Sequence, residues 1–203
     1  PKLARRKSSG YSPATQVTSI SYQRHCDDMT NKTDITYGIP AEVWPRDYSN
    51  VEKALMFWRK SLIPVRVTME DGQVFCMYVQ GLMSSRNKVD LCPAPFDKEN
   101  RIRLPLERIS TIESGVTEGI AHDFTGRTTV HPDYVDNRPS RRDFFKICRQ
   151  AHEMQKSIRV YMADGREIEG GSSGVDACQA TLNMGDGRKT VVMFDWVERI
   201  LPF

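Results

Sequence analysis

The sequence predicts a mainly β protein with helices, built from two similar units in which one α-helix precedes five short strands that bend into a small barrel. Three observations predict this fold. Short apolar stretches alternate with polar residues and are separated by Asp-Gly turns. A helical pattern precedes each group of strands. The stretch IPVRVTMEDG, residues 63–72, returns in similar form as SIRVYMADG, residues 157–165.

The composition suits a folded chain of one large domain or two small ones. The 203 residues are 39% hydrophobic and 27% charged, which favours a packed core over global disorder. No run of 18 apolar residues is present, so no membrane span is expected. The five cysteines have no CxxC spacing and the four histidines no ligand spacing. We therefore expect reduced thiols in a cytoplasmic protein, with no metal and no cofactor.

Residues 1–48 predict a basic, extended or disordered N-terminal arm, because they are rich in Ser, Thr, Asn and Pro and lack periodicity. One short strand is expected at 16–22. The net charge of the chain is only +3, so nucleic acid would have to be bound by local patches. One such patch in the arm consists of Lys2, Arg5, Arg6 and Lys7.

The first unit covers residues 49–113. Ser49 is expected to cap a helix that ends before Pro64, and the short strands follow. Residues 114–140 combine Gly, Pro and polar residues and predict a linker. The second unit covers residues 141–203, and Ser140 is expected to cap its helix.

The second unit repeats the first along its length. Val65-Arg66-Val67 matches Ile158-Arg159-Val160 at an offset of 93 residues, and the Asp-Gly turns match at the same offset. Glu107-Arg108-Ile109 matches Glu198-Arg199-Ile200 at an offset of 91. Matches in the same order with one gap predict an internal duplication.

The stretch WRKSLIPVRVTMEDGQ, residues 58–73, resembles the helix-to-strand junction of the bacterial RNA chaperone family Hfq. Residues 164–202 are similar to the rest of an Hfq or Sm-like barrel through Gly165, Gly170, Asp176 and Pro202. This resemblance implies two tandem Sm-like (SH3-like) five-stranded bent β-barrels in one chain. It also implies a non-enzymatic RNA-binding or post-transcriptional regulatory function.

The resemblance has a consequence for assembly. The family pairs the fourth strand of one barrel with the fifth strand of the next, because exposed strand edges require partners. A fused pair satisfies one such edge internally and offers two more. Self-association through these edges is therefore one expectation, and coverage of the edges by the linker and the arm is the other.

The sequence departs from the family where Tyr-Lys-His normally helps to hold uridine-rich RNA. By alignment, Pro105-Leu106-Glu107 and Trp196-Val197-Glu198 stand there. Carboxylates repel phosphate, so this departure puts the usual uridine site in doubt.

The expected RNA contacts are basic, amide or aromatic side chains in loops, at the start of the second helix and in the arm. Each has an ordinary alternative: a solvated loop, the solvent face of a helix or, for Trp196, packing on the barrel. Outside the arm, these candidates are Arg86, Asn87, Lys88, Arg108, Arg141, Arg142, Arg188, Lys189 and Trp196.

No arrangement of residues predicts catalysis. MGDGRK, residues 184–189, lacks the spacing of a phosphate-binding loop and indicates a hairpin turn. GGSSG, residues 170–174, indicates a kinked strand. The sequence thus predicts a non-enzymatic RNA-binding regulator. Two alternatives stay open: a scaffold that recruits a protein partner by strand addition, and a DNA-binding regulator.

Overall fold

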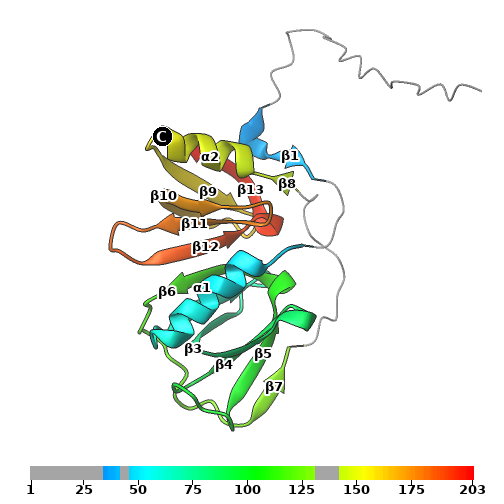
Figure 1. Cartoon of the computed structure of the whole chain (residues 1–203), viewed down its shortest axis with the longest axis vertical. Helices are drawn as coiled ribbons and strands as arrows, with labels where there is room; N and C mark the ends of the chain where they lie inside the picture. The colour runs from blue at the N-terminus through cyan, green and yellow to red at the C-terminus, as the bar shows by residue number, and fades with distance from the viewer. Residues whose placement is uncertain (1–33, 42–45, 131–141) are drawn as a thin grey trace, which may run out of the picture. The chain divides into compact units, whose positions relative to one another are not determined.

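Each half of the protein consists of one helix followed by five strands (Figure 1). The computed structural model describes residues 34–41, 46–130 and 142–203. The first half comprises α1 (Ser49–Lys60), β2 (Val65–Met69), β3 (Val74–Met83), β4 (Lys88–Cys92), β5 (Arg101–Pro105) and β6 (Ile109–Ser114). The second half comprises α2 (Phe145–Glu153), β9 (Ser157–Met162), β10 (Glu167–Val175), β11 (Gln179–Asn183), β12 (Lys189–Met193) and β13 (Val197–Pro202).

Three shorter strands lie outside the two halves. β1 (Ile39–Pro40) pairs with β8 (Arg142–Asp143) just before α2. β7 (Arg127–Thr129) follows the first half and lies inside the predicted linker. The strand expected at residues 16–22 lies outside the described residues.

The five strands have the same spatial order in both halves. The large sheet has eleven strands in the order β13-β9-β10-β11-β12-β6-β2-β3-β4-β5-β7. Each half therefore contributes its strands in the order fifth, first, second, third, fourth. The mainly β class with two helices and the repetition of one helix and five strands agree with the sequence pattern.

The strands form one open sheet, so the two expected five-stranded bent β-barrels are not confirmed. In the first half β6 bonds to β12 of the second half on one side and to β2 on the other. The outer edge of β5 bonds to β7. To close a barrel in the first half, β5 and β6 would have to pair with each other, but each of them is paired with another strand. The pair β12–β6 is a fourth strand bonded to a fifth strand within one chain, and β7 comes from the predicted linker.

The repeat requires a different alignment near its end. Ile109 pairs with Met69 in the first half, and Val197 pairs with the equivalent Met162 in the second. Their offset is 88 residues, so the match of Glu107-Arg108-Ile109 to Glu198-Arg199-Ile200 is wrong by three positions. The reason is loop length: eight residues separate β4 from β5, whereas five separate β11 from β12.

Bends in the long second strands follow the glycines. The register shifts between Val79 and Gly81 in β3 and between Ser172 and Gly174 in β10. An extra residue on one strand bends it and increases its twist. The kink expected from GGSSG is therefore present, and residues 184–188 form the expected turn between β11 and β12.

Both helices cover the core with one face. α1 buries Val51, Leu55 and Trp58 at the spacing of one helix side, and α2 buries Ile147, Cys148 and Ala151 in the same way. The two N-termini use an aspartate in place of the expected serines. The Oδ1 atom of Asp47 accepts from the Ser49 N–H at 2.9 Å, and that of Asp143 accepts from the Phe145 N–H at 2.7 Å.

The second helix is shorter than expected because its first turn is replaced by β8. It begins at Phe145 rather than near Arg141, and Ser140 lies outside the described residues. No helix in the described part of the chain has the length and apolarity needed to span a membrane.

The buried thiol on α2 predicts a specific pH dependence of stability. Burial raises the pKa of Cys148 from 9.0 to about 12, and the charge of Asp143 adds to the rise. The unfolded thiol ionises at lower pH than the folded one, so the unfolded state binds fewer protons between these values. The free energy of unfolding should therefore fall as the pH rises from about 9 toward 12.

Urea titrations at pH 8 and pH 10.5 measure this dependence, and Cys148→Ala is the matched variant. The variant should lose part of the alkaline decrease in stability, whatever its stability at pH 8. An identical decrease in both proteins would contradict the role given to this thiol.

Candidate functional site: the seam between the halves

The two halves meet along a seam, which we define as the paired strands β12 and β6. Thr190, Val191 and Val192 lie opposite Glu113, Ile112 and Thr111 in antiparallel register. At the end of the seam, the Lys189 N–H donates to the Ser114 hydroxyl at 3.0 Å, and that hydroxyl lies 3.2 Å from the Lys189 carbonyl oxygen. Backbone pairing therefore makes one sheet of both halves.

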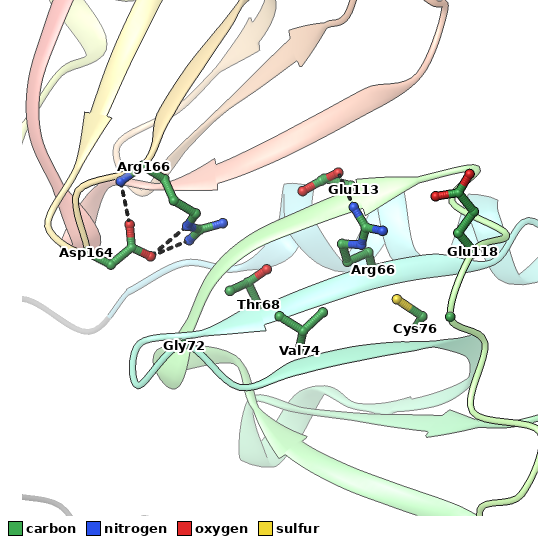
Figure 2. Close-up of a pocket in the computed structure, with 10 residues that line it drawn as sticks. Arg66, Thr68, Gly72, Val74, Cys76, Glu113, Glu118, Asp164 and Arg166 are labelled. Carbon is green, nitrogen blue, oxygen red and sulfur yellow. Dashed lines mark hydrogen bonds and ion pairs between the residues drawn. The ribbon is translucent and has the colours of Figure 1, made fainter.

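Arg166 fixes the turn between β9 and β10 against the other half. Its Nη1 donates to the Thr111 hydroxyl at 3.1 Å and its Nη2 to the Ser110 hydroxyl at 2.9 Å. Its Nε donates to Oδ2 of Asp164 at 2.7 Å (Figure 2). All three nitrogens are thus engaged, and the guanidinium holds a fixed position beside the seam.

The segment leading into α1 crosses to the second half. Arg46 forms an ion pair with Asp195, and their side chains are only 5% and 6% exposed. The Nη1 atom of Arg46 also donates to the Ala177 carbonyl at 3.1 Å. Next to this pair, the Asn50 amide donates to Oδ2 of Asp176 at 2.8 Å. The first helix is therefore anchored to the second half as well as to its own strands.

A groove of about 810 Å³ lies beside the seam, and we call it the seam groove. Thr68, Val74 and Cys76 line it from β2 and β3, and residues from both halves and from the segment after β6 line the rest (Figure 2). The remaining lining residues are Arg66, Gly72, Glu113, Glu118, Gly119, Asp164 and Arg166.

The charges of the seam groove are largely paired. Arg66 lies 3.8 Å from the Glu113 carboxylate, on the same wall (Figure 2). The Cys76 thiol and then the Glu113 charge raise the pKa of Arg66 against the opposing effect of burial. Two arginines face three carboxylates in this groove, so it does not form a phosphate cradle. It offers fixed donors and acceptors to a polar ligand.

A second groove of about 690 Å³ runs between α1 and β3. Lys53 and Arg59 line it together with Glu52, Gln80 and Ser84. Within the described residues, the buried Nε of Arg59 has no hydrogen-bond partner. This groove belongs to the first half alone, whereas the seam groove requires both halves.

The predicted loop contacts do not gather into one patch. Arg86 and Asn87 are exposed, and Lys88 begins β4. The Asn87 carbonyl accepts from the Leu106 N–H, next to the start of β6. Arg188 and Lys189 lie at the opposite end of β6, beside Ser114. Arg188 is also paired with Asp186 at 2.5 Å.

Other candidates have structural roles in the described part of the chain. Arg108 is an ion-pair partner of Glu70 and lies 3.5 Å from Asp71. Trp196 is 7% exposed and belongs to the core, so its ring presents no face to a base in this structure. Arg142 donates to the Tyr37 carbonyl at 2.6 Å. The remaining candidates, Arg141, Lys2, Arg5, Arg6 and Lys7, lie outside the described residues.

Sequence reasoning missed the residues that join the halves. Asp195 carries a usable signal, because an acid within the apolar run VVMFDW predicts a paired buried charge. Arg166 follows a predicted turn, and nothing in its neighbourhood indicates a long-range contact. Arg46 was assigned to the arm by composition, which hides a single buried arginine. Among the residues that the structure describes, no three His, Cys, Asp or Glu side chains gather as metal ligands would.

The fold and the seam define a mainly β protein of two repeated halves, with a polar groove to which both halves contribute. The family model described as "Repressor of phase-1 flagellin" matches residues 34–200, and the chain belongs to this family.

Curated relatives from Salmonella are similar over most of their length. A repressor of phase 1 flagellin gene from Salmonella typhimurium is 34% identical over 170 residues, which is 82% of this chain and 92% of the relative. The protein of the same name from Salmonella abony is 33% identical over 167 residues, with the same coverage. No solved structure matches the chain.

These matches overturn the resemblance to Hfq and the Sm-like family, and with it the predicted Hfq-like RNA-binding function. The resemblance depended mainly on residues 58–73, where a helix ending in two basic residues enters a strand. Basic residues suit the last turn of any helix, where they offset the helix dipole. Leu62 then adopts a left-handed conformation with φ 53°, which ends the helix before the strand. The motif therefore reflects a local helix end rather than membership of that family.

Proposed function

We propose that this protein represses expression of a flagellin gene and does so by binding rather than by catalysis. The observation that carries this proposal is the family match, which covers residues 34–200 and thus both halves and the seam. The name of the relatives, repressor of phase 1 flagellin gene, supplies the target gene. Because bacterial genes are expressed in the cytoplasm, we propose that the protein acts there.

The arrangement of the halves supports repression by one unit. The predicted boundaries 49–113 and 141–203 describe two domains, and we propose that they act together. Asn50 and Arg166 bond from one half to the other, and Arg46, just before α1, bonds to the second half, so we expect the two halves to move as one unit. A repressor that acts by occupancy needs such a surface of fixed geometry.

A reporter assay tests this function. The complete control region and start of a flagellin gene are fused to a reporter in a bacterium that lacks its own flagellin repressor, and this chain is expressed from an inducible plasmid. We expect reporter activity to fall several-fold on induction, while a reporter with an unrelated control region stays constant. Unchanged activity at a normal level of folded chain would refute the proposal.

The seam groove is the surface that we propose for this function. Arg66→Ala and Thr68→Ala change the lining of the seam groove without removing a backbone hydrogen bond of the seam, and they should weaken repression at unchanged protein level. Lys53→Ala and Glu52→Ala, in the groove beside α1, are the matched variants and should repress normally. If the variants at Lys53 and Glu52 lose repression and those at Arg66 and Thr68 keep it, the groove beside α1 is the functional surface. The proposal that the protein represses the gene would still stand.

A further inference from the structure

We propose that β5 of one copy of this chain can pair with β13 of a second copy, which would form a second seam. We also propose that β7 acts as a guard strand: it covers the edge of β5 and prevents this pairing. The internal seam joins the fourth strand of the second half, β12, to the fifth strand of the first half, β6. The remaining fourth strand is β5 and the remaining fifth strand is β13. Apart from β7, these two strands are the ends of the described sheet.

The internal seam predicts the register of the second one. The 88-residue offset relates β12 to β5 and β6 to β13. The pair of Val191 in β12 and Ile112 in β6 therefore corresponds to Arg103 in β5 opposite Ile200 in β13. The same offset converts Thr190 opposite Glu113 into Ile102 opposite Leu201. The strand order is the same in both halves, so β13 of a second copy fits antiparallel to β5 as β6 fits to β12.

The strand β7 occupies the positions that this pairing needs. Its residues Arg127, Thr128 and Thr129 lie opposite Arg101, Ile102 and Arg103. Every other strand pair in the described sheets is antiparallel, whereas β7 pairs in parallel. β7 therefore comes from outside the repeated pattern and takes the place of a partner strand.

The attachment of β7 is small. The Arg101 N–H donates to the Gly126 carbonyl and the Val130 N–H to the Arg103 carbonyl, both at 2.9 Å. Asn100 Oδ1 accepts from the Gly126 N–H at 2.7 Å. β7 has only three residues, two of them exposed, so it contributes little apolar burial. Segments with so few contacts have a low free energy of local opening.

The edge of β13 is partly covered as well. The Nε atom of Arg199 donates to the Thr36 hydroxyl at 3.2 Å, and its guanidinium lies 4.7 Å from the centre of the Tyr37 ring. The predicted register places Arg199 opposite Leu104 of the second copy. Both edges are thus covered by segments from outside the two halves, as short or charged segments protect exposed strands elsewhere.

Thr128→Pro tests the guard, because proline lacks the N–H in the middle of β7. Thr125→Pro, in the loop before β7, is the matched control. Masses are measured by light scattering after gel filtration over a range of concentrations. We expect the wild type and Thr125→Pro to remain near 23.2 kDa, and Thr128→Pro to form dimers or longer assemblies as concentration rises.

Two additions show that the assembly uses the predicted edges. A peptide with the sequence of residues 124–130, FTGRTTV, should return Thr128→Pro to the mass of one chain. Leu201→Glu, introduced into Thr128→Pro, places a charge opposite Ile102 and should have the same effect. If the circular dichroism of Thr128→Pro is not native, Asn100→Ala, which removes the acceptor of the Gly126 N–H and the amide donor to Asp97, is used in its place.

A guard variant with a native spectrum that keeps the mass of one chain at every concentration would overturn the proposal. Assembly that neither the peptide nor Leu201→Glu reverses would also overturn it. These measurements do not depend on repression. The proposed pairing of two copies and the proposed repression of a flagellin gene are therefore tested independently.

Discussion

Replacing Arg46 with alanine should lower the free energy of unfolding by roughly 3–5 kcal/mol, the largest effect that we expect from the loss of one charged side chain. The side chains of Arg46 and Asp195 are both nearly inaccessible to water. Removal of the guanidinium leaves a carboxylate in a site that water does not reach, and its desolvation is then poorly compensated. The carbonyl of Ala177 loses a donor at the same time.

Chemical unfolding in urea measures this loss, and Arg149→Ala is the control. Arg149 pairs with Glu153 one helical turn away, but their side chains are 63% and 59% exposed. Exposed pairs of this kind contribute about 0.3–0.5 kcal/mol. A double replacement of Arg46 and Asp195 by Met and Leu should recover much of the stability. A loss below about 1 kcal/mol for Arg46→Ala would show that the pair is solvated.

Gly170→Ala should destabilise the second half by about 1–3 kcal/mol, because its methyl group has no room. The added carbon would lie 2.8 Å from the Asn183 carbonyl oxygen and 3.1 Å from Cβ of Leu182. The nearer atom belongs to the backbone of β11, which pairs with β10 and cannot move without disturbing that pairing.

The next residue is a matched control for this effect. A methyl group at Gly171 would meet no atom within 4 Å. Alanine costs less backbone entropy than glycine in a strand, so Gly171→Ala should be neutral or more stable by up to about 1 kcal/mol. Thermal unfolding compares the two variants. Equal melting temperatures for both would contradict the close approach of β10 and β11.

Local patterns in the sequence predicted most of the individual elements. Alternation of apolar residues and the Asp71-Gly72 turn specify β2 and β3, because strand faces and tight turns depend on neighbouring residues. The helix over Ser49–Lys60 follows from its apolar spacing. The predicted start of α2 was too early because Arg142–Asp143 form β8, and Asp143 then accepts from the Phe145 N–H at the start of the helix.

Contacts between distant residues could not be derived in the same way. The seam pairs Thr111 with Val192, and no local pattern distinguishes this pairing from closure of a barrel. The resemblance correctly suggested a fourth strand beside a fifth, although the family was wrong, because the same strand order creates the same open edges. A tryptophan in a predicted turn, Trp196, left two readings open, stacking on a base and packing on the barrel, and the burial of the turn agrees with packing.

The continuous sheet through the seam is the central claim, since both the proposed function and the guarded edges depend on it. Amide hydrogen exchange tests it most directly. We expect β6 and β12 to be protected to the same degree as β2 and β9, because they are interior strands of one cooperative sheet. The most informative amides are those of Ile112 and Val191, which face each other across the seam, because the neighbouring amides of Thr111 and Val192 point to β2 and β11. Fast exchange at these positions, with β2 and β9 still protected, would show that the two halves are separate sheets and would contradict the account.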